Sequence, residues 1–69
     1  MENKRDPEKF ITVSVAAKRL NLSDSHIYSL CDSGKIKHYR FGKSYRIKNK
    51  DLDQYMRRCA VKAQLSENN

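Results

Sequence analysis

The sequence predicts a small, mainly α-helical domain that carries one β-hairpin. Three observations lead to this fold class. Apolar side chains recur at helical spacing in three stretches, near residues 13–20, 24–33 and 49–59. Aromatic and cationic side chains alternate between residues 38 and 48, which is typical of a hairpin. The chain has two glycines and one proline, so we expect few turns.

Length and composition favour a binding module over an enzyme. A chain of 69 residues forms one small domain with little room for an enclosed active site. We find no nucleophile triad, paired carboxylates or phosphate-cradling glycine loop, and therefore expect no catalytic residue and no cofactor. Two cysteines do not indicate a disulfide framework. No apolar run suits a membrane span or a signal segment, so we expect a cytoplasmic protein without a membrane partner.

The first predicted helix follows a short extended piece at residues 10–12. Thr12 suits the N-cap position, and Asn21 suits a left-handed residue at the helix end. Its apolar positions have the spacing i, i+3, i+4, i+7. They are Val13, Ala16, Ala17 and Leu20.

The second predicted helix begins after Ser23 and ends at Gly34. Asp24 lies in its first turn, where the helix dipole favours an anion. Its apolar face consists of Ile27, Leu30 and Cys31. A turn of about three residues separates the two helices, which is the helix-turn-helix spacing.

The predicted hairpin is centred on Gly42, Lys43 and Ser44. A three-residue loop places every apolar side chain of the hairpin on one face, where we expect them to enter the core. These side chains are Tyr39, Phe41, Tyr45 and Ile47. Arg40 and Arg46 then share the polar face. A two-residue Gly42-Lys43 turn is also chemically sound but divides the aromatic rings between the faces. We favour the three-residue loop.

The third predicted helix starts near Asn49 and carries an apolar stripe of Leu52, Tyr55, Met56 and Cys59. Both Cys31 and Cys59 are interpreted as small core residues. The two cysteines, His26 and His38 lack the paired spacing of a zinc site, so no metal is expected. The chain thus divides into a flexible arm (1–9), a domain (10–60) and a frayed tail (61–69).

The net charge of +7 lies in one segment. Residues 34–50 hold seven Lys or Arg and no Asp or Glu, whereas acidic and basic residues balance in the flanking segments. The isoelectric point is about 9.7. A basic run with aromatic residues between its cations favours nucleic acid as the partner.

Taken together, the motifs resemble the excisionase-type DNA-binding domain, a small winged helix-turn-helix related to the MerR-like superfamily. The resemblance covers residues 11–58 and rests on "TVSVAAKRL", "LS", "IYSLCDSGKI", "YRFGKSYRI" and "KDLDQYM". It implies binding to double-stranded DNA, either as an excisionase that bends DNA beside an integrase or recombinase, or as a small transcriptional regulator of a prophage or plasmid. No coiled-coil heptads follow the third helix, so we expect a monomer in solution that binds DNA cooperatively.

On this resemblance, the second helix enters the major groove and the hairpin is a wing on the DNA backbone. The recognition-helix residues are Ser23, Asp24, Ser25, His26, Tyr28 and Ser29. The wing residues are Lys35, Lys37, Arg40, Lys43, Ser44, Arg46 and Lys48. For the rings of Tyr39, Phe41 and Tyr45 we favour a core position over stacking on bases. Relatives often carry basic or large polar side chains at positions 24 and 29, so no Arg–guanine contact is carried over. Seven phosphate contacts from residues 35–50 would give a salt slope of about −6.

Two other function classes stay open at this point. A protein-interaction adaptor would use the apolar side chains that the helices do not explain, Val15, Val61 and Leu65. An RNA-binding protein would not place a helix in the groove, because the major groove of A-form RNA does not admit one.

Overall fold

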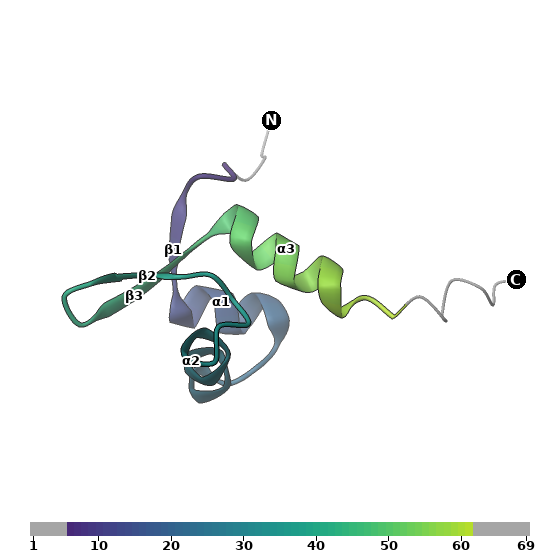
Figure 1. Cartoon of the computed structure of the whole chain (residues 1–69), viewed down its shortest axis with the longest axis horizontal. Helices are drawn as coiled ribbons and strands as arrows, with labels where there is room; N and C mark the ends of the chain where they lie inside the picture. Colours follow the sequence, from purple (N-terminus) through teal and green to yellow (C-terminus); the bar gives the residue numbers. More distant parts are fainter. Residues whose placement is uncertain (1–5, 62–69) are drawn as a thin grey trace, which may run out of the picture.

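The computed structural model describes residues 6–61, which form three helices and a three-stranded antiparallel sheet (Figure 1). The elements in order are β1 (Phe10–Thr12), α1 (Val13–Leu20), α2 (Asp24–Asp32), β2 (Tyr39–Phe41), β3 (Ser44–Lys48) and α3 (Asn49–Cys59). The predicted fold class, a winged helix-turn-helix, is confirmed. Residues 1–5 of the predicted arm and 62–69 of the predicted tail lie outside the described residues.

Local sequence signals set both ends of α1. The Thr12 hydroxyl accepts a hydrogen bond from Val15 N at 3.2 Å. Asn21 follows the last turn with a φ of 58°. Leu22 N then donates to Ala17 O at 2.9 Å, which closes the helix with a Schellman motif. The predicted cap and stop are both confirmed.

An N-cap and a Schellman motif also set the two ends of α2. Ser23 Oγ accepts a hydrogen bond from His26 N at 3.1 Å. Beyond the last turn, Gly34 has a φ of 80°, a conformation that costs glycine little because it has no Cβ. Lys35 N donates to Leu30 O at 2.9 Å, so α2 also ends in a Schellman motif. The chain thereby turns sharply from the helix toward the wing.

The core lies between α1, α2, one face of the sheet and the first turns of α3. Ala16, Ile27, Ile47 and Leu52 are each 0% exposed. The other buried apolar residues are Ile11, Val13, Ala17, Leu30, Cys31 and Ile36. The predicted apolar faces of the first two helices are therefore confirmed.

The sheet has the strand order β1-β3-β2. Ile11 lies opposite Ile47 in the β1–β3 pair, and both side chains are buried. Because side chains alternate along a strand, Phe10 and Thr12 point to the other face. The sequence predicts residues 10–12 as an extended piece, but their pairing with β3 emerges only in the structure. We call the face that carries Ile11 and Ile47 the inner face, and the opposite one the outer face.

The hairpin turn corrects a prediction. Phe41 pairs with Ser44, so Gly42 and Lys43 alone form the connection and the three-residue loop is wrong. Gly42 has a φ of 67°, whereas Lys43 is not among the residues with positive φ, which is the pattern of a type II′ turn.

This register divides the aromatic residues of the hairpin between the two faces. Tyr45 and Ile47 lie on the inner face, whereas Tyr39 and Phe41 lie on the outer face. Phe41 is 55% exposed, so its predicted place in the core is wrong. The reason is that Ile47 must meet Ile11 in the core, and the two-residue period of a strand then fixes every other position.

The first turns of α3 pack against the core, whereas the end of the helix extends away from it (Figure 1). Leu52 is fully buried and Tyr55 partly buried, but Met56 is 43% exposed and Cys59 is exposed. The predicted stripe is therefore wrong in its last turns, and Cys59 is not a core residue. Helical periodicity buries a side chain only where another element faces it. None of the helices within residues 6–61 has the length and apolar content needed to cross a bilayer.

The segment before β1 satisfies the N-terminal end of α3. Lys9 O accepts a hydrogen bond from Asn49 N, and Pro7 O accepts one from Lys50 N, both at 3.0 Å. The Asn49 side chain also donates to Asp6 O at 2.7 Å. These bonds pair helix N–H groups that would otherwise lack partners. This part of the predicted flexible arm is thus bound to the start of α3.

Candidate nucleic-acid interface

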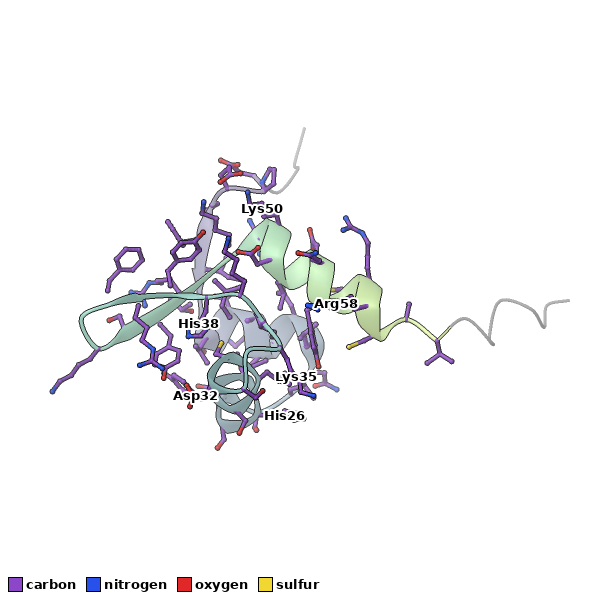
Figure 2. The ribbon with its side chains drawn as sticks, viewed as in Figure 1. His26, Asp32, Lys35, His38, Lys50 and Arg58 are labelled. Carbon is purple, nitrogen blue, oxygen red and sulfur yellow. The ribbon has the colours of Figure 1, made fainter. Side chains whose placement is uncertain are left out.

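The solvent side of α2 presents short polar side chains and one aromatic ring. Ser25, His26 and Ser29 are exposed, and Tyr28 is 42% exposed. Figure 2 shows His26 at the edge of the molecule, away from α3. The hydroxyl of Ser23 accepts from His26 N, so Ser23 acts as the helix cap. The surface has little bulk, which lets α2 approach the base edges of a groove closely.

The end of α2 is joined to the wing by side chains that we call the α2–wing junction. It consists of Tyr28, Asp32, His38, Arg40 and Tyr45. The Tyr45 hydroxyl donates to Asp32 Oδ1 at 2.7 Å, and Arg40 Nη2 donates to the same oxygen at 3.2 Å. The bond to the ionised carboxylate raises the pKa of Tyr45, as does partial burial. Tyr45 is thus held as a neutral hydrogen-bond donor.

Ring contacts complete the α2–wing junction around Tyr45. Its ring meets Tyr28 edge to face at a centroid distance of 4.9 Å, and His38 stacks on it at 5.2 Å. The Arg40 guanidinium lies 4.6 Å from the centroid of the same ring. The wing is therefore fixed beside α2 by hydrogen bonds and by aromatic packing.

The junction changes the role expected of Arg40, which the sequence places among the phosphate contacts. Its charge is offset by Asp32, and both side chains are more than half exposed. The two groups together therefore carry almost no net charge. A signal for this contact is present in the sequence, because Asp32 is the only acidic residue between positions 25 and 50.

A second carboxylate, that of Glu8, forms ion pairs with two further cations of the basic segment, Lys48 and Lys50. Glu8 accepts from Lys48 and from Lys50, each at 2.8 Å. These two hydrogen bonds lower the pKa of Glu8 to about 2, and the bond to Glu8 raises the pKa of Lys48. Figure 2 shows Lys50 at the opposite end of the molecule from His26 and Asp32. Lys48, a predicted wing contact, is thereby placed on the outer face and away from α2.

Four cations of residues 35–50 form no ion pair within the described part of the chain: Lys35, Lys37, Lys43 and Arg46. Lys43 occupies the wing turn, and Ser44 beside it is exposed. Arg46 lies opposite Tyr39 on the outer face, whereas Arg40 lies opposite Tyr45 on the inner face. The prediction that the two arginines share a face is therefore wrong.

A cationic hollow of about 220 Å³ lies between α3 and the segment that follows α2. Lys35, Tyr55 and Arg58 line it, and Arg58 Nη2 donates to Lys35 O at 3.4 Å. A hydrogen bond with Cys59 and partial burial raise the pKa of Tyr55. Figure 2 shows Lys35 and Arg58 between the end of α2 and α3. The sequence analysis missed Arg58 as a partner of Lys35, because the two meet only through the packing of α3.

The residues that the structure describes form no metal site, and the thiol of Cys31 is enclosed in the core. Within residues 6–61, His, Cys, Asp and Glu side chains nowhere gather in groups of three or more that could hold a metal ion. Cys31 is 1% exposed, and burial raises the pKa of its thiol. Cys31 is therefore a core residue, as predicted.

Comparison with known proteins agrees with this geometry. Residues 10–60 match the family described as "Helix-turn-helix domain", whose members are small DNA-binding domains. No curated protein and no solved structure matches the chain. The matched span contains α2, the wing and the α2–wing junction, and covers well over half of the sequence. The chain therefore belongs to the helix-turn-helix domain family.

Proposed function

We propose that this protein binds double-stranded DNA with α2 in the major groove and the wing on the neighbouring backbone or minor groove. The observation that carries the proposal is the α2–wing junction. Through Asp32, Tyr45 and Arg40 it holds a wing tip with a cation, Lys43, beside a helix face of short polar side chains. A preformed spacing between two DNA-contacting elements lowers the ordering cost of binding.

The electrostatics support a modest affinity for the backbone. Lys35 follows the end of α2, and Lys43 lies at the wing tip. If these two lysines each contact one phosphate, the salt slope is about −2. If Lys37 and Arg46 also reach phosphates, the slope becomes about −4. Arg40, Lys48 and Lys50 are already paired with carboxylates, so we expect a slope smaller in magnitude than the value of about −6 for the whole basic run.

We further propose an architectural role, that of an excisionase or recombination directionality factor that bends DNA. The motif order of residues 11–58 supports it, and so does the predominance of small side chains on α2, which favours recognition through DNA shape. In this proposal the protein is a cytoplasmic monomer that binds cooperatively beside a recombinase. It has no catalytic activity and needs no cofactor.

The alternative is a small transcriptional regulator of a prophage or plasmid. The two roles differ in the symmetry of the bound site. A dimeric regulator favours half-sites related by dyad symmetry, whereas a monomer that binds in an array favours direct repeats. Selection of bound sequences from a random pool distinguishes them, and gel mobility of fragments with the site at different positions measures the bend.

The first experiment on the proposed function is a fluorescence anisotropy titration with a labelled random duplex of about 30 base pairs. Titrations between roughly 50 and 200 mM salt give the slope of log K against log salt. We expect micromolar binding and a slope between about −2 and −4. Absence of binding at low salt would contradict duplex binding.

A Lys43→Ala variant tests the wing. It removes one unpaired cation from the turn, so we expect weaker binding to all sequences and a slope smaller in magnitude by about 0.9. Lys50→Ala is the matched control, because Lys50 is paired with Glu8 on the far side of the molecule. Equal effects of the two substitutions would contradict the assigned interface.

A further inference from the structure

The outer face of the sheet carries aromatic rings that serve neither the core nor the α2–wing junction. Phe10 comes from β1, and Tyr39 and Phe41 come from β2. Tyr45 touches α2 from the inner face, so the outer face points away from the recognition helix. A surface on this side is therefore turned away from the α2 part of the proposed duplex interface.

The three rings form one contiguous cluster. Phe10 meets Tyr39 at a centroid distance of 5.2 Å and Phe41 at 5.4 Å, in both cases nearly perpendicular. Phe41 is 55% exposed and Phe10 is 39% exposed. Contacts across the central strand hold the rings in place while much of their surface faces water. Contiguous exposed apolar surface of this kind marks an interaction site.

Cations lie around the rings. Lys48 Nζ is 5.5 Å from the centroid of Phe10 and 5.3 Å from that of Tyr39, and Lys37 Nζ is 5.7 Å from that of Tyr39. Arg46 lies on the same face. None of the strand residues of the outer face is acidic. Among the described carboxylates, only Glu8 forms ion pairs at this face, and it does so at the edge, with Lys48 and Lys50.

We propose that this outer face binds single-stranded DNA. Proteins that bind single strands combine aromatic rings, on which bases stack, with cations that follow the phosphates. Here Phe41 and Phe10 supply exposed ring surface, and Lys37, Arg46 and Lys48 supply positive charge within the same small area. The proposed contact needs no base-specific hydrogen bond, so it is tolerant of sequence. It does not depend on the proposed duplex function, because α2 takes no part in it.

The chain offers a clean spectroscopic test, since it contains no tryptophan. A Phe41→Trp variant places a single indole at the most exposed ring of the cluster. We expect oligo(dT) to quench its emission as bases stack on the ring, while a random duplex at the same nucleotide concentration quenches it much less. Emission that oligo(dT) leaves unchanged would overturn the proposal.

Anisotropy with labelled oligo(dT) provides the matched comparison. We expect Phe41→Ala to weaken oligo(dT) binding about tenfold, the loss of one stacked base, and to leave duplex binding as in the wild type. Tyr28→Ala, which truncates a similarly exposed ring on the α2 side, should leave oligo(dT) binding unchanged. Equal losses in the two variants would overturn the proposal.

A second substitution at Phe41 tests stacking, and an RNA oligonucleotide tests the preference for DNA. Phe41→Leu keeps an apolar side chain but removes the flat ring, so oligo(dT) binding equal to that of the wild type would contradict stacking. Tighter binding of oligo(rU) than of oligo(dT) would overturn the assignment to DNA. Circular dichroism of each variant establishes that it is folded, which we expect because the side chain of Phe41 is more than half exposed.

Discussion

The two faces of the small sheet carry the same kinds of side chain but use them differently. On the inner face Ile11 and Ile47 are buried, and Tyr45 and Arg40 are bound to Asp32 of α2. On the outer face Phe10 and Phe41 are exposed, and Glu8 binds cations at one edge only.

The difference lies in what each face meets. The inner face has a helix against it, so its ring and its arginine fix the position of the wing. The outer face has no element of the described chain packed on its rings, so they stay available to a ligand. Composition alone therefore does not assign a role to an aromatic or cationic residue of the wing, because its strand register decides which of the two faces it joins.

The largest expected effect is a difference in folding stability between substitutions on the inner face and substitutions on the outer face. Ile47→Ala truncates a fully buried side chain opposite Ile11, and we expect it to lower the free energy of unfolding by about 2–5 kcal/mol. Phe41→Ala on the outer face should cost less than about 1 kcal/mol, since the ring is 55% exposed. Urea denaturation followed by circular dichroism measures both. Similar losses would show that the outer rings form a second core.

The next largest effect is a difference between Asp32 and Glu8 in how strongly each influences duplex binding. Asp32→Asn removes the charge that offsets Arg40 but keeps a hydrogen-bond acceptor for Tyr45, so the salt slope should steepen by about 0.9. Glu8→Gln makes the same change beside Lys48 and Lys50, which lie away from α2, and should leave the duplex slope unaltered. Anisotropy titrations at several salt concentrations measure both. An equal change in both variants would place duplex DNA on both faces.

A smaller effect appears as a pH dependence of stability. The pKa of Glu8 falls from 4.5 to about 2 in the folded protein, so the unfolded chain binds this proton more readily. The contribution of Glu8 is therefore complete above about pH 4.5 and is lost as the pH falls toward 2. Because the Glu8 side chain is 59% exposed, salt screening keeps this contribution small.

Urea midpoints of the wild type and of Glu8→Gln, measured from pH 6 to pH 2, isolate this group. We expect the wild type to be the more stable at pH 6 and the difference to vanish near pH 2. A difference that stays constant over this range would contradict the ion pairs at the outer edge.

The smallest expected effect concerns sequence preference. Ser29→Ala removes one short hydroxyl from the middle of α2, and we expect a change of about fivefold in the affinity ratio between preferred and random duplexes, at the low end for a single base contact. The salt slope should stay the same, since no charge is removed. Competition with unlabelled duplexes measures the ratio. A change in slope without a change in preference would mean that Ser29 lies against the backbone.

Local features of this fold are predictable from the sequence because neighbouring residues determine them. Thr12 and Ser23 cap the two helices, and Asn21 and Gly34 end them, with the partners three to five residues away. Charge placement and motif order were likewise sufficient to point to α2 and the wing as the candidate DNA-binding elements.

Features that depend on distant partners were not predictable. Lys48 bonds to Glu8 across 40 positions, and nothing near Lys48 indicates that its charge is taken up. Phe10 meets Tyr39 and Phe41 only because β1 joins the sheet on the far side of β3. The stripe on α3 has the right period, yet Cys59 is exposed because no other helix or strand within residues 6–61 covers it. In each case the missing information is tertiary placement rather than local propensity.

Chemical-shift mapping by nuclear magnetic resonance tests the central claim, that duplex DNA meets the α2 side of the sheet, most directly. With ¹⁵N-labelled protein and a duplex, we expect the largest amide shifts at residues 24–29 and at Gly42 and Lys43, with Phe10 and Tyr39 little changed. The largest shifts at Phe10 and Tyr39, with α2 unperturbed, would contradict the account.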